Sequence, residues 1–385
     1  MSLEMMQSLI LILAVTVMFG WGAQRVGLPA VAGQLVSGIV LGPALLNWVQ
    51  MTDVLSVLAE IGVILLMFLV GIETDFALLA SKFKTAFSAA MFGAIVPLVV
   101  FYGLARWVGY EFETALFWGI VFSATSVSIT AEVLSEYRQL KTPAGATILG
   151  AAVVDDLLAV GLVSAFVAYF GASGGHGHGP ELAVWQQVGY PIGFFIIMLV
   201  AGKFILPHLL RWLAQVPVSG ALVIGGVGIA LSAAWLAQAA GLSAIVGSFL
   251  AGILIGRLPK AEQLFNLMTP VSYAVFVPVF FASIGLAMTF DGLLDKWWLL
   301  LVLSVAAVAT KWLGAGFGTR LLGEKWPTAN IVGIGMIARG EMALIIAKLG
   351  LDAHVISVAV YSELTLVIVV STLVAPVLLR QVLVK

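Results

Sequence analysis

The chain of 385 residues is too apolar and too sparsely charged to be an ordinary soluble protein. Hydrophobic residues make up 62% of it, charged residues 10%, and the mean hydropathy is +1.14, whereas soluble domains are roughly 25% charged. A net charge of −1 gives no reason to expect a nucleic-acid partner, and the absence of cysteine excludes disulfides and thiol chemistry. The composition predicts an all-α polytopic protein of the lipid bilayer, with nothing that calls for a cofactor.

Hydropathy divides the chain into thirteen expected transmembrane helices. The first is read as a span and not as a signal peptide, because Glu4 and no Lys or Arg precedes its apolar run. The predicted spans run near 5–23, 30–47, 54–72, 83–108, 114–135, 144–170, 185–214, 217–240, 242–256, 265–289, 296–322, 327–350 and 354–384.

The basic residues between spans predict the orientation. With the N-terminus outside, three lie on the outer face, namely Arg106, Lys296 and Lys348. Twelve then lie on the inner face: Arg25, Lys82, Lys84, Arg138, Lys141, Arg211, Arg257, Lys260, Arg320, Lys325, Arg380 and Lys385. This asymmetry places the N-terminus outside and the C-terminus in the cytoplasm.

Two adjacent acids, Asp155 and Asp156, interrupt the apolar run 148–170, and Lys311 interrupts the run 299–317. A charge at the centre of a membrane helix is unfavourable by roughly 2.5–3.5 kcal/mol on insertion scales, so the default interpretation is functional. Asp155 is about twelve residues, or ~18 Å, from the inner end of its span, and Lys311 is at a similar depth. The three residues are therefore expected to meet near the midplane.

An internal repeat relates the two halves of the chain. Residues 27–42 and 241–256 are identical at seven of sixteen positions, and the same offset of 214 residues carries Gly71 onto Gly285. Small-residue packing motifs explain one such match but not an offset shared by two spans. Span nine comes seven spans after span two, and an odd number of crossings means that the two spans cross the membrane in opposite directions. Spans 1–6 and 8–13 are therefore predicted to form two inverted six-helix repeats, a recurring plan of transporters.

The repeat predicts two crossed broken helices. The offset carries Thr125, in the polar stretch 123–130, onto Arg339, in GIGMIARGEMALIIA. Broken helices at matched positions indicate a transport site. Arg339 and Glu341 either neutralise the partial charges of the half-helix ends or pair with each other. The hydroxyls of the stretch have the alternative of bonding to their own helix carbonyls.

Some polar groups fall outside this scheme. The offset carries Asp155 onto Val369 and Lys311 onto Pro97, so the charged residues have no counterparts in the other repeat. The intramembrane acids Glu60 and Glu363 are interpreted as structural. His176 and His178, in the loop GASGGHGHGP, are interpreted as part of a linker and not as a metal site.

Several motifs together resemble those of the bacterial monovalent cation/proton antiporters. They are GAAVVDDLLAV, TSVSIT, GMIARGEMAL, FLVGIET and the mid-span Lys311. The paired aspartates are similar to the subgroup of the NapA and NhaA kind. Related potassium/proton antiporters usually show Gln-Asp, where this chain has Asp155-Asp156.

The resemblance implies a core that carries the ion, a dimerisation panel and a homodimer. Close helix approach at the glycine-rich spans two and nine of the panel is consistent with such a dimer. The implied divisions are 1–81 (panel, first half), 82–170 (core, first half), 171–216 (external loop and linker helix), 217–294 (panel, second half) and 295–385 (core, second half).

The resemblance also implies roles for individual residues. Asp156 is similar to the carboxylate that binds sodium, and Asp155 to the partner of Lys311. Thr125 and Ser126 lie where the broken helix of the family faces the ion. Ser126 stands where some relatives have an acid, so one ligand charge is missing there.

The expected function is exchange of sodium, or lithium, for protons across the bacterial inner membrane, by a transporter and not an enzyme. A potassium/proton antiporter is the main alternative; a channel would need filter rings from several chains, and an organic-anion symporter would not need a buried Asp–Lys pair. Asp155, Asp156 and Lys311 are expected to titrate as one coupled set. If all three take part, two protons move per sodium and the exchange carries net charge.

Overall fold

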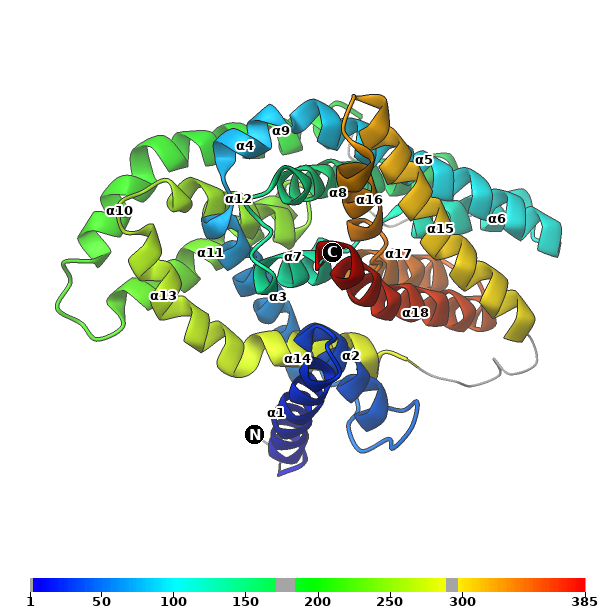
Figure 1. Cartoon of the computed structure of the whole chain (residues 1–385), viewed down its shortest axis with the longest axis horizontal. Coiled ribbons are helices and arrows are strands. Elements are labelled where there is room, and N and C mark those ends of the chain that lie inside the picture. The colour runs from blue at the N-terminus through cyan, green and yellow to red at the C-terminus, as the bar shows by residue number, and fades with distance from the viewer. Residues whose placement is uncertain (1–2, 171–183, 289–296, 385) are drawn as a thin grey trace. The chain divides into compact units, whose positions relative to one another are not determined.

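The structure is a computed structural model that describes residues 3–170, 184–288 and 297–384. Within these ranges every regular element is helical (Figure 1). His176, His178, Lys296 and most of the predicted external loop lie outside the described residues.

The helices follow the predicted apolar ranges closely. In chain order they are α1 (Leu3–Arg25), α2 (Ala30–Leu41), α3 (Asp53–Glu73), α4 (Phe76–Ser81), α5 (Phe83–Val108), α6 (Phe112–Ser123), α7 (Val127–Glu136), α8 (Pro143–Phe170), α9 (Val184–Val200), α10 (Leu206–Leu213), α11 (Ala221–Ala239), α12 (Ala244–Gly256), α13 (Ala261–Val271), α14 (Val277–Leu286), α15 (Trp297–Leu321), α16 (Trp326–Gly335), α17 (Glu341–Asp352) and α18 (Val358–Leu383).

The described residues contain ten helical segments that are long and apolar enough to cross a membrane. This confirms an all-helical polytopic membrane protein. The helices α2 and α12 are shorter, with 12 and 13 residues, so each rises only about 18–20 Å. The predicted span 30–47 is helical only to Leu41, because the chain turns away at Gly42, whose backbone is extended.

Four predicted spans are interrupted helices. Residues 124–126 separate α6 from α7, and residues 336–340 separate α16 from α17. The π-helical turns η2 (Ala201–Ile205) and η3 (Ser272–Phe276) join α9 to α10 and α13 to α14. The two non-helical breaks fall where the sequence places its polar residues inside apolar spans.

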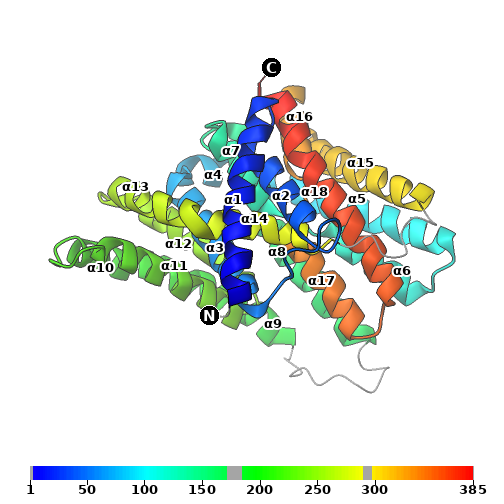
Figure 2. The same cartoon turned by 90° about the horizontal axis from the view of Figure 1, so that it is seen from below.

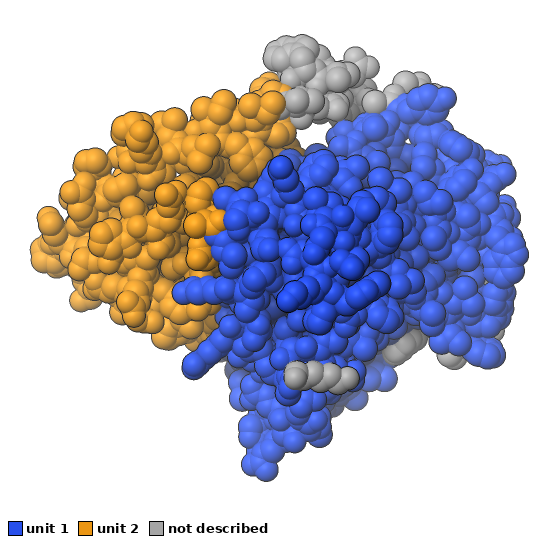
Figure 3. Space-filling model, turned by 45° about the horizontal axis from the view of Figure 1, so that its top comes forward, with its two compact units in different colours: residues 1–53, 78–175, 281–385 blue, residues 54–77, 176–280 orange. Residues whose placement is uncertain are grey.

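The chain divides into two compact units (Figure 3). Unit 1 holds residues 1–53, 78–175 and 281–385, and unit 2 holds residues 54–77 and 176–280. The predicted core ranges, 82–170 and 295–385, therefore lie in unit 1. The predicted panel ranges are divided between the two units, so the panel remains a prediction.

Aromatic and aliphatic side chains fill the interior of unit 1. Phe101 of α5 and Phe122 of α6 stack with ring centroids 3.8 Å apart, and Trp118 is fully buried beside them. The most extensive contact between described helices of this unit joins α5 to α15, whose Phe92 and Phe317 rings meet edge to face. This packing holds α15, which carries Lys311, against the first half of the core.

Glycines allow neighbouring helices to approach closely in both units. In unit 1, α2 packs against α1 (Figure 2), and a Cβ at Gly33 would overlap the carbonyl of Phe19. In unit 2, a Cβ at Gly71 of α3 would lie 3.0 Å from the Cα of Gly252 on α12. Helices in lipid gain van der Waals contact from such small residues.

Candidate functional site

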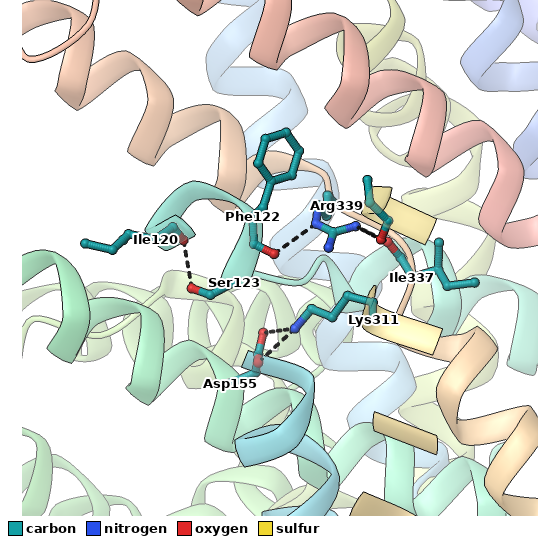
Figure 4. Close-up of polar contacts among 8 residues, drawn as sticks. Ile120, Phe122, Ser123, Asp155, Lys311, Ile337 and Arg339 are labelled. Carbon is teal, nitrogen blue, oxygen red and sulfur yellow. Dashed lines mark hydrogen bonds and ion pairs between the residues drawn. The ribbon is translucent and has the colours of Figure 1, made fainter. Parts of the chain in front are cut away.

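Lys311 and Asp155 form a buried ion pair inside unit 1 (Figure 4). The Lys311 Nζ atom lies 3.1 Å from Asp155 Oδ1 and 3.4 Å from Oδ2, and the two side chains are 0% and 2% exposed. Asp155 lies twelve residues into α8 and Lys311 ten residues before the end of α15. The meeting of these two residues, predicted from their depths, is thus seen in the structure.

Such a pair holds two charges away from water at considerable desolvation cost. Removing one partner from a buried pair is unfavourable by about 3–5 kcal/mol, because the other charge is then buried without a counterion. The pair is therefore weak support for stability by itself, and its retention points to function.

Asp156 is 7% exposed and lies beside this pair. No side chain or backbone group among the described residues hydrogen-bonds its carboxylate. It is close enough to Asp155 and Glu341 for direct Coulombic repulsion from both. A carboxylate with free lone pairs and like-charged neighbours is ready to receive a cation or a proton.

The break between α6 and α7 supplies neutral oxygen atoms to the same region. The Thr125 hydroxyl is buried and makes no hydrogen bond to any residue that the structure describes. The Ser126 hydroxyl donates to Glu341 Oε2 over 2.9 Å, and Ser128 donates to Glu341 Oε1 over 3.2 Å. Thr125 is therefore the hydroxyl left available for a ligand, whereas Ser126 is already engaged.

The two breaks are joined by their backbones. The Ser126 amide donates to the Ala338 carbonyl over 2.8 Å, and the Thr130 hydroxyl donates to the Gly335 carbonyl over 2.6 Å. Helix ends leave backbone groups without helical partners. Here the first residues of α7 supply partners for the end of α16 and for the segment that follows it.

Arg339, in the second break, bonds near the C-terminal end of α6 (Figure 4). Its Nε donates to the Phe122 carbonyl over 3.1 Å, and its Nη1 donates to the carbonyls of Ala307 over 2.6 Å and Ile337 over 3.4 Å. The guanidinium also lies 5.4 Å from the centroid of the Phe122 ring. Arg339 therefore places its charge at the Phe122 carbonyl near the end of α6, where the helix dipole is negative.

Glu341 is the first residue of α17, where the helix dipole is positive. The described contacts contain no hydrogen bond or ion pair between Glu341 and Arg339; each is bonded to the opposite break. Of the two arrangements that the sequence left open, this geometry matches neutralisation of the half-helix ends.

One partner in this network was missed by the sequence reasoning. The Thr372 hydroxyl, from the middle of α18, donates to the Arg339 carbonyl. The only sequence signal was a hydroxyl within an apolar span, and such hydroxyls more often bond to their own helix, as Ser371 does with Ile368.

The charged residues of this region are not balanced. Asp155, Asp156 and Glu341 would carry three negative charges against two positive charges on Lys311 and Arg339. Asp155 is close enough to Asp156, Lys311 and Arg339 for direct Coulombic interaction with each of them. One bound monovalent cation or one proton would bring the sum to zero.

The described residues contain no group of three or more His, Asp or Glu side chains arranged to hold a metal ion. A cation at Asp156 would therefore rely on one full carboxylate charge and on neutral oxygens. That ligand set suits a monovalent ion better than a divalent one, which needs several anionic oxygens.

Comparisons with known proteins agree over nearly the whole chain. Residues 10–385 match the family described as sodium/hydrogen exchanger, transmembrane. The chain is 38% identical to a Na⁺/H⁺ antiporter of Enterococcus hirae over 380 residues, which cover 98% of each chain. It is 36% identical to the Na⁺/H⁺-K⁺ antiporter GerN of Bacillus cereus, over 99% of this chain and 96% of that one.

The fold is also similar to that of the sodium proton antiporter MjNhaP1 of Methanocaldococcus jannaschii. The TM-score is 0.72 at 15% identity, covering 99% of this chain and 96% of that one. Likeness at this identity shows the fold alone, and it is to an NhaP-type antiporter and not to the NhaA kind that the paired aspartates indicated. The family predicted from the motifs is confirmed: the chain belongs to the sodium/hydrogen exchanger family.

Proposed function

We propose that the protein is a secondary active antiporter that exchanges sodium, or lithium, for protons by alternating access. The observation that carries this proposal is the Lys311–Asp155 ion pair beside Asp156, whose carboxylate has no described partner. Asp156 is near Glu341 and Lys311 is near Arg339, both charges of the second break, and that break is bonded to the first through the Ser126 amide. The sodium/proton antiporters named among the relatives support the same activity.

Asp156 is the proposed cation ligand, assisted by the Thr125 hydroxyl. A desolvated monovalent cation needs a full negative charge among oxygen atoms. Asp155 serves as the second acid, and Lys311 is its counterion when no sodium is bound. Ser126 contributes by holding Glu341 and not as a direct ligand, because its hydroxyl already donates to that carboxylate.

The charge count explains why exchange is obligatory. With sodium or a proton bound, the five charges of the site approach zero, and the core can move. With neither bound, the site keeps an uncompensated negative charge at membrane depth, which is unfavourable. In the proposed cycle sodium binding loosens the Asp155–Lys311 pair, and proton binding displaces sodium so that the pair forms again. If Lys311 also releases a proton when it separates from Asp155, the sodium-bound and protonated states differ by one charge, so that two protons move per sodium and the exchange is electrogenic.

The inverted repeat and the count of thirteen spans are part of the proposal. An offset of 214 residues carries the first residues of α5, α6 and α7 onto the first residues of α15, α16 and α17, and α8 onto α18 within one residue. This agreement between helix bounds supports two six-helix repeats joined by α9 and α10. In this scheme α2 and α12 are short spans, and α16 with α17 makes one broken span.

The proposal includes a homodimer in the inner membrane, with the N-terminus outside and the C-terminus in the cytoplasm. The distribution of Lys and Arg between loops supports the orientation. The glycine contacts of α2 and α12 support close packing in the proposed panel. Native mass spectrometry in mild detergent and in lipid measures the oligomeric state, and monomers alone would contradict the dimer.

A potassium/proton antiporter is the second candidate. It is favoured by one observation, the name of the GerN relative as a Na⁺/H⁺-K⁺ antiporter. The two candidates use the same site and differ in the cation that Asp156 accepts.

The experiment reconstitutes the purified protein in vesicles that contain a pH-sensitive dye. Sodium or lithium added outside should drive protons across the membrane, and potassium should do so only under the second candidate. Asp156→Asn should reduce the exchange by about 100-fold or more, because a neutral amide cannot replace the charge at that depth.

Glu111→Gln removes an exposed acid at the start of α6 and serves as the matched control. It should exchange like the wild type. Sodium-driven proton flux in folded Asp156→Asn at the rate of the control would contradict the assignment of Asp156. Sodium flux without proton movement in the wild type would point to a channel instead.

A further inference from the structure

A groove lies on unit 1 between α5, α15 and α16, away from the ion pair. It encloses about 420 Å³ and is lined mainly by apolar side chains, among them Val96, Leu313, Phe317 and Trp326. Its volume falls in the ~300–1,000 Å³ range of ligand pockets. Phe317 is 56% exposed and Trp326 is 69% exposed. A groove of this kind in a membrane protein has room for a hydrocarbon chain.

Two basic residues stand at one end of this groove. Leu313, Phe317 and Arg320 follow one another at helical spacing, so they share one face of α15. The Arg320 guanidinium lies 5.9 Å from the Trp326 ring, and Lys325 directly precedes that tryptophan. The apolar stripe of α15 thus ends in a cation, beside a second one.

No acid that the structure describes forms an ion pair with either cation. Glu324 is the acid between them in the sequence, and it pairs with Lys82 over 2.6 Å. Among the described residues Arg320 bonds only to the backbone carbonyl of Glu324, and Lys325 has no hydrogen-bond or ion-pair partner. Two cations remain free to meet an anion.

A polar group lies one step deeper in the groove. The Trp312 indole nitrogen donates to Asn330 Oδ1 over 2.8 Å, which orients the amide. The Asn330 amide nitrogen then has no acceptor among the described residues. Asn330 is four residues, or ~6 Å, past the first residue of α16, and the polar region of a leaflet is about 5–8 Å deep. In the proposed orientation α16 begins at the cytoplasmic surface, and the free donor then lies at the depth of lipid ester carbonyls.

We propose that this groove binds one anionic phospholipid. The phosphate meets Arg320 and Lys325, an ester carbonyl accepts from Asn330, and an acyl chain lies along Phe317, Leu313 and Trp312. The order of groups along the groove, cationic, then amide, then apolar, is the order along such a lipid. In the proposed orientation the site opens to the cytoplasmic leaflet, and it does not depend on which ion the protein exchanges.

The test uses native mass spectrometry of the full chain in mild detergent with added phosphatidylglycerol or phosphatidylcholine. The wild type should retain one phosphatidylglycerol at lipid concentrations where phosphatidylcholine is lost. The double variant Arg320→Gln/Lys325→Gln should weaken that retention by about tenfold or more, since each basic residue near a bilayer surface contributes roughly fivefold. Equal retention of the two lipids by the wild type would overturn the proposal.

Arg138→Gln/Lys141→Gln is the matched control, because it removes two exposed basic residues from the same predicted face. It should bind phosphatidylglycerol like the wild type, and an equal loss in the control would show that only net charge matters. Val96→Trp fills the groove and should exclude the lipid while leaving both cations in place.

Thermal unfolding in detergent separates binding from folding. Phosphatidylglycerol should raise the unfolding temperature of the wild type and of the control pair, but not of Val96→Trp or Arg320→Gln/Lys325→Gln. Unfolding temperatures of all variants in phosphatidylcholine alone identify any variant that is misfolded. Stabilisation of the wild type by inorganic phosphate to the same extent would indicate a site for the free anion and would overturn the lipid assignment.

Discussion

The break between α6 and α7 and the break between α16 and α17 are 214 residues apart in the sequence, and they are filled by different chemistry. The first break contributes neutral hydroxyls and is followed by α8, which carries both aspartates. The second contributes one cation and one anion, Arg339 and Glu341, and is followed by α18, where the counterpart of Asp155 is Val369. In the proposed site the first half therefore offers groups to the ion, and the charges of the second half bond to groups at the ends of the broken helices.

Under the proposed inverted repeat, this difference would leave a single ion site in a duplicated frame. The charged residues that the proposal assigns to transport lie on α8 and α15, and their counterparts Val369 and Pro97 are apolar. The charges of the second break are engaged with groups of the first, through Phe122, Ser126 and Ser128. The predictions below test whether the two halves keep these separate roles.

The largest expected change in stability comes from Lys311→Gln. It leaves Asp155 buried without a counterion and should lower the free energy of unfolding by about 3–5 kcal/mol. The double variant Lys311→Gln/Asp155→Asn should recover most of that loss. Thermal unfolding in detergent measures both, and Lys82→Gln, which breaks the more exposed pair with Glu324, should lose at most ~1 kcal/mol.

Lys311→Gln also tests how many protons are exchanged for each sodium ion. Wild-type protein should give a current on a solid-supported membrane under a sodium gradient, because two protons exchange for one sodium. Electroneutral exchange by the wild type would contradict two protons per sodium. A folded Lys311→Gln protein that exchanges ions without current would place the second proton on the lysine.

Arg339→Gln tests the structural role of the second break. It removes the bonds to the carbonyls of Phe122, Ala307 and Ile337, and buried carbonyls without donors are unfavourable by about 1–3 kcal/mol each. We expect a loss of about 3 kcal/mol in unfolding free energy. Arg106→Gln removes an exposed arginine bonded to one carbonyl and should have little effect. A stable Arg339→Gln protein with no transport would assign Arg339 to the ion and not to the helix ends.

Ser126→Ala tests the role of the hydroxyl that bonds to Glu341, as distinct from the unbonded hydroxyl of Thr125. It removes a donor to Glu341 and should lower stability by about 1–3 kcal/mol, because the carboxylate loses a buried bond. Ser362→Ala, which removes an exposed hydroxyl bonded within its own helix, should change stability little. An unchanged unfolding temperature for Ser126→Ala would show that Glu341 does not depend on this contact.

Thr125→Val is expected to have the smallest effect on stability and a measurable effect on transport. Its hydroxyl is buried without a described partner, so replacing it by a methyl group should not weaken folding. The sodium concentration for half-maximal exchange should rise by about three- to tenfold, because one neutral ligand is lost. Thr16→Val is the control, since that hydroxyl is satisfied within α1. Unaltered sodium dependence would remove Thr125 from the site.

Much of the fold could be predicted from the sequence, because lipid leaves few choices to an apolar chain. Hydropathy located the helices, and the polar residues inside two apolar spans located both breaks. The pairing of Lys311 with Asp155 followed from their depths in two helices, because opposite charges at the same depth of a membrane are stabilised by pairing with each other.

The remaining contacts depend on geometry that spacing does not contain. Arg339 and Glu341 have opposite charges two residues apart, so the sequence allowed them to pair with each other or with helix ends. The choice is set by the positions of the Phe122 carbonyl and the Ser126 hydroxyl, which come from another part of the chain. For the same reason Thr372 could not be distinguished from hydroxyls that bond within their own helix.

The backbone bond from the Ser126 amide to the Ala338 carbonyl also bears on how the protein moves. If the two breaks separated during a transport cycle, this amide and carbonyl would be released at a depth where no lipid group can receive them. The cycle is therefore expected to carry both breaks together as one rigid body. In hydrogen–deuterium exchange the Ser126 amide should then remain protected during turnover, at the same level as in the resting protein, while amides at the sliding surfaces become labelled.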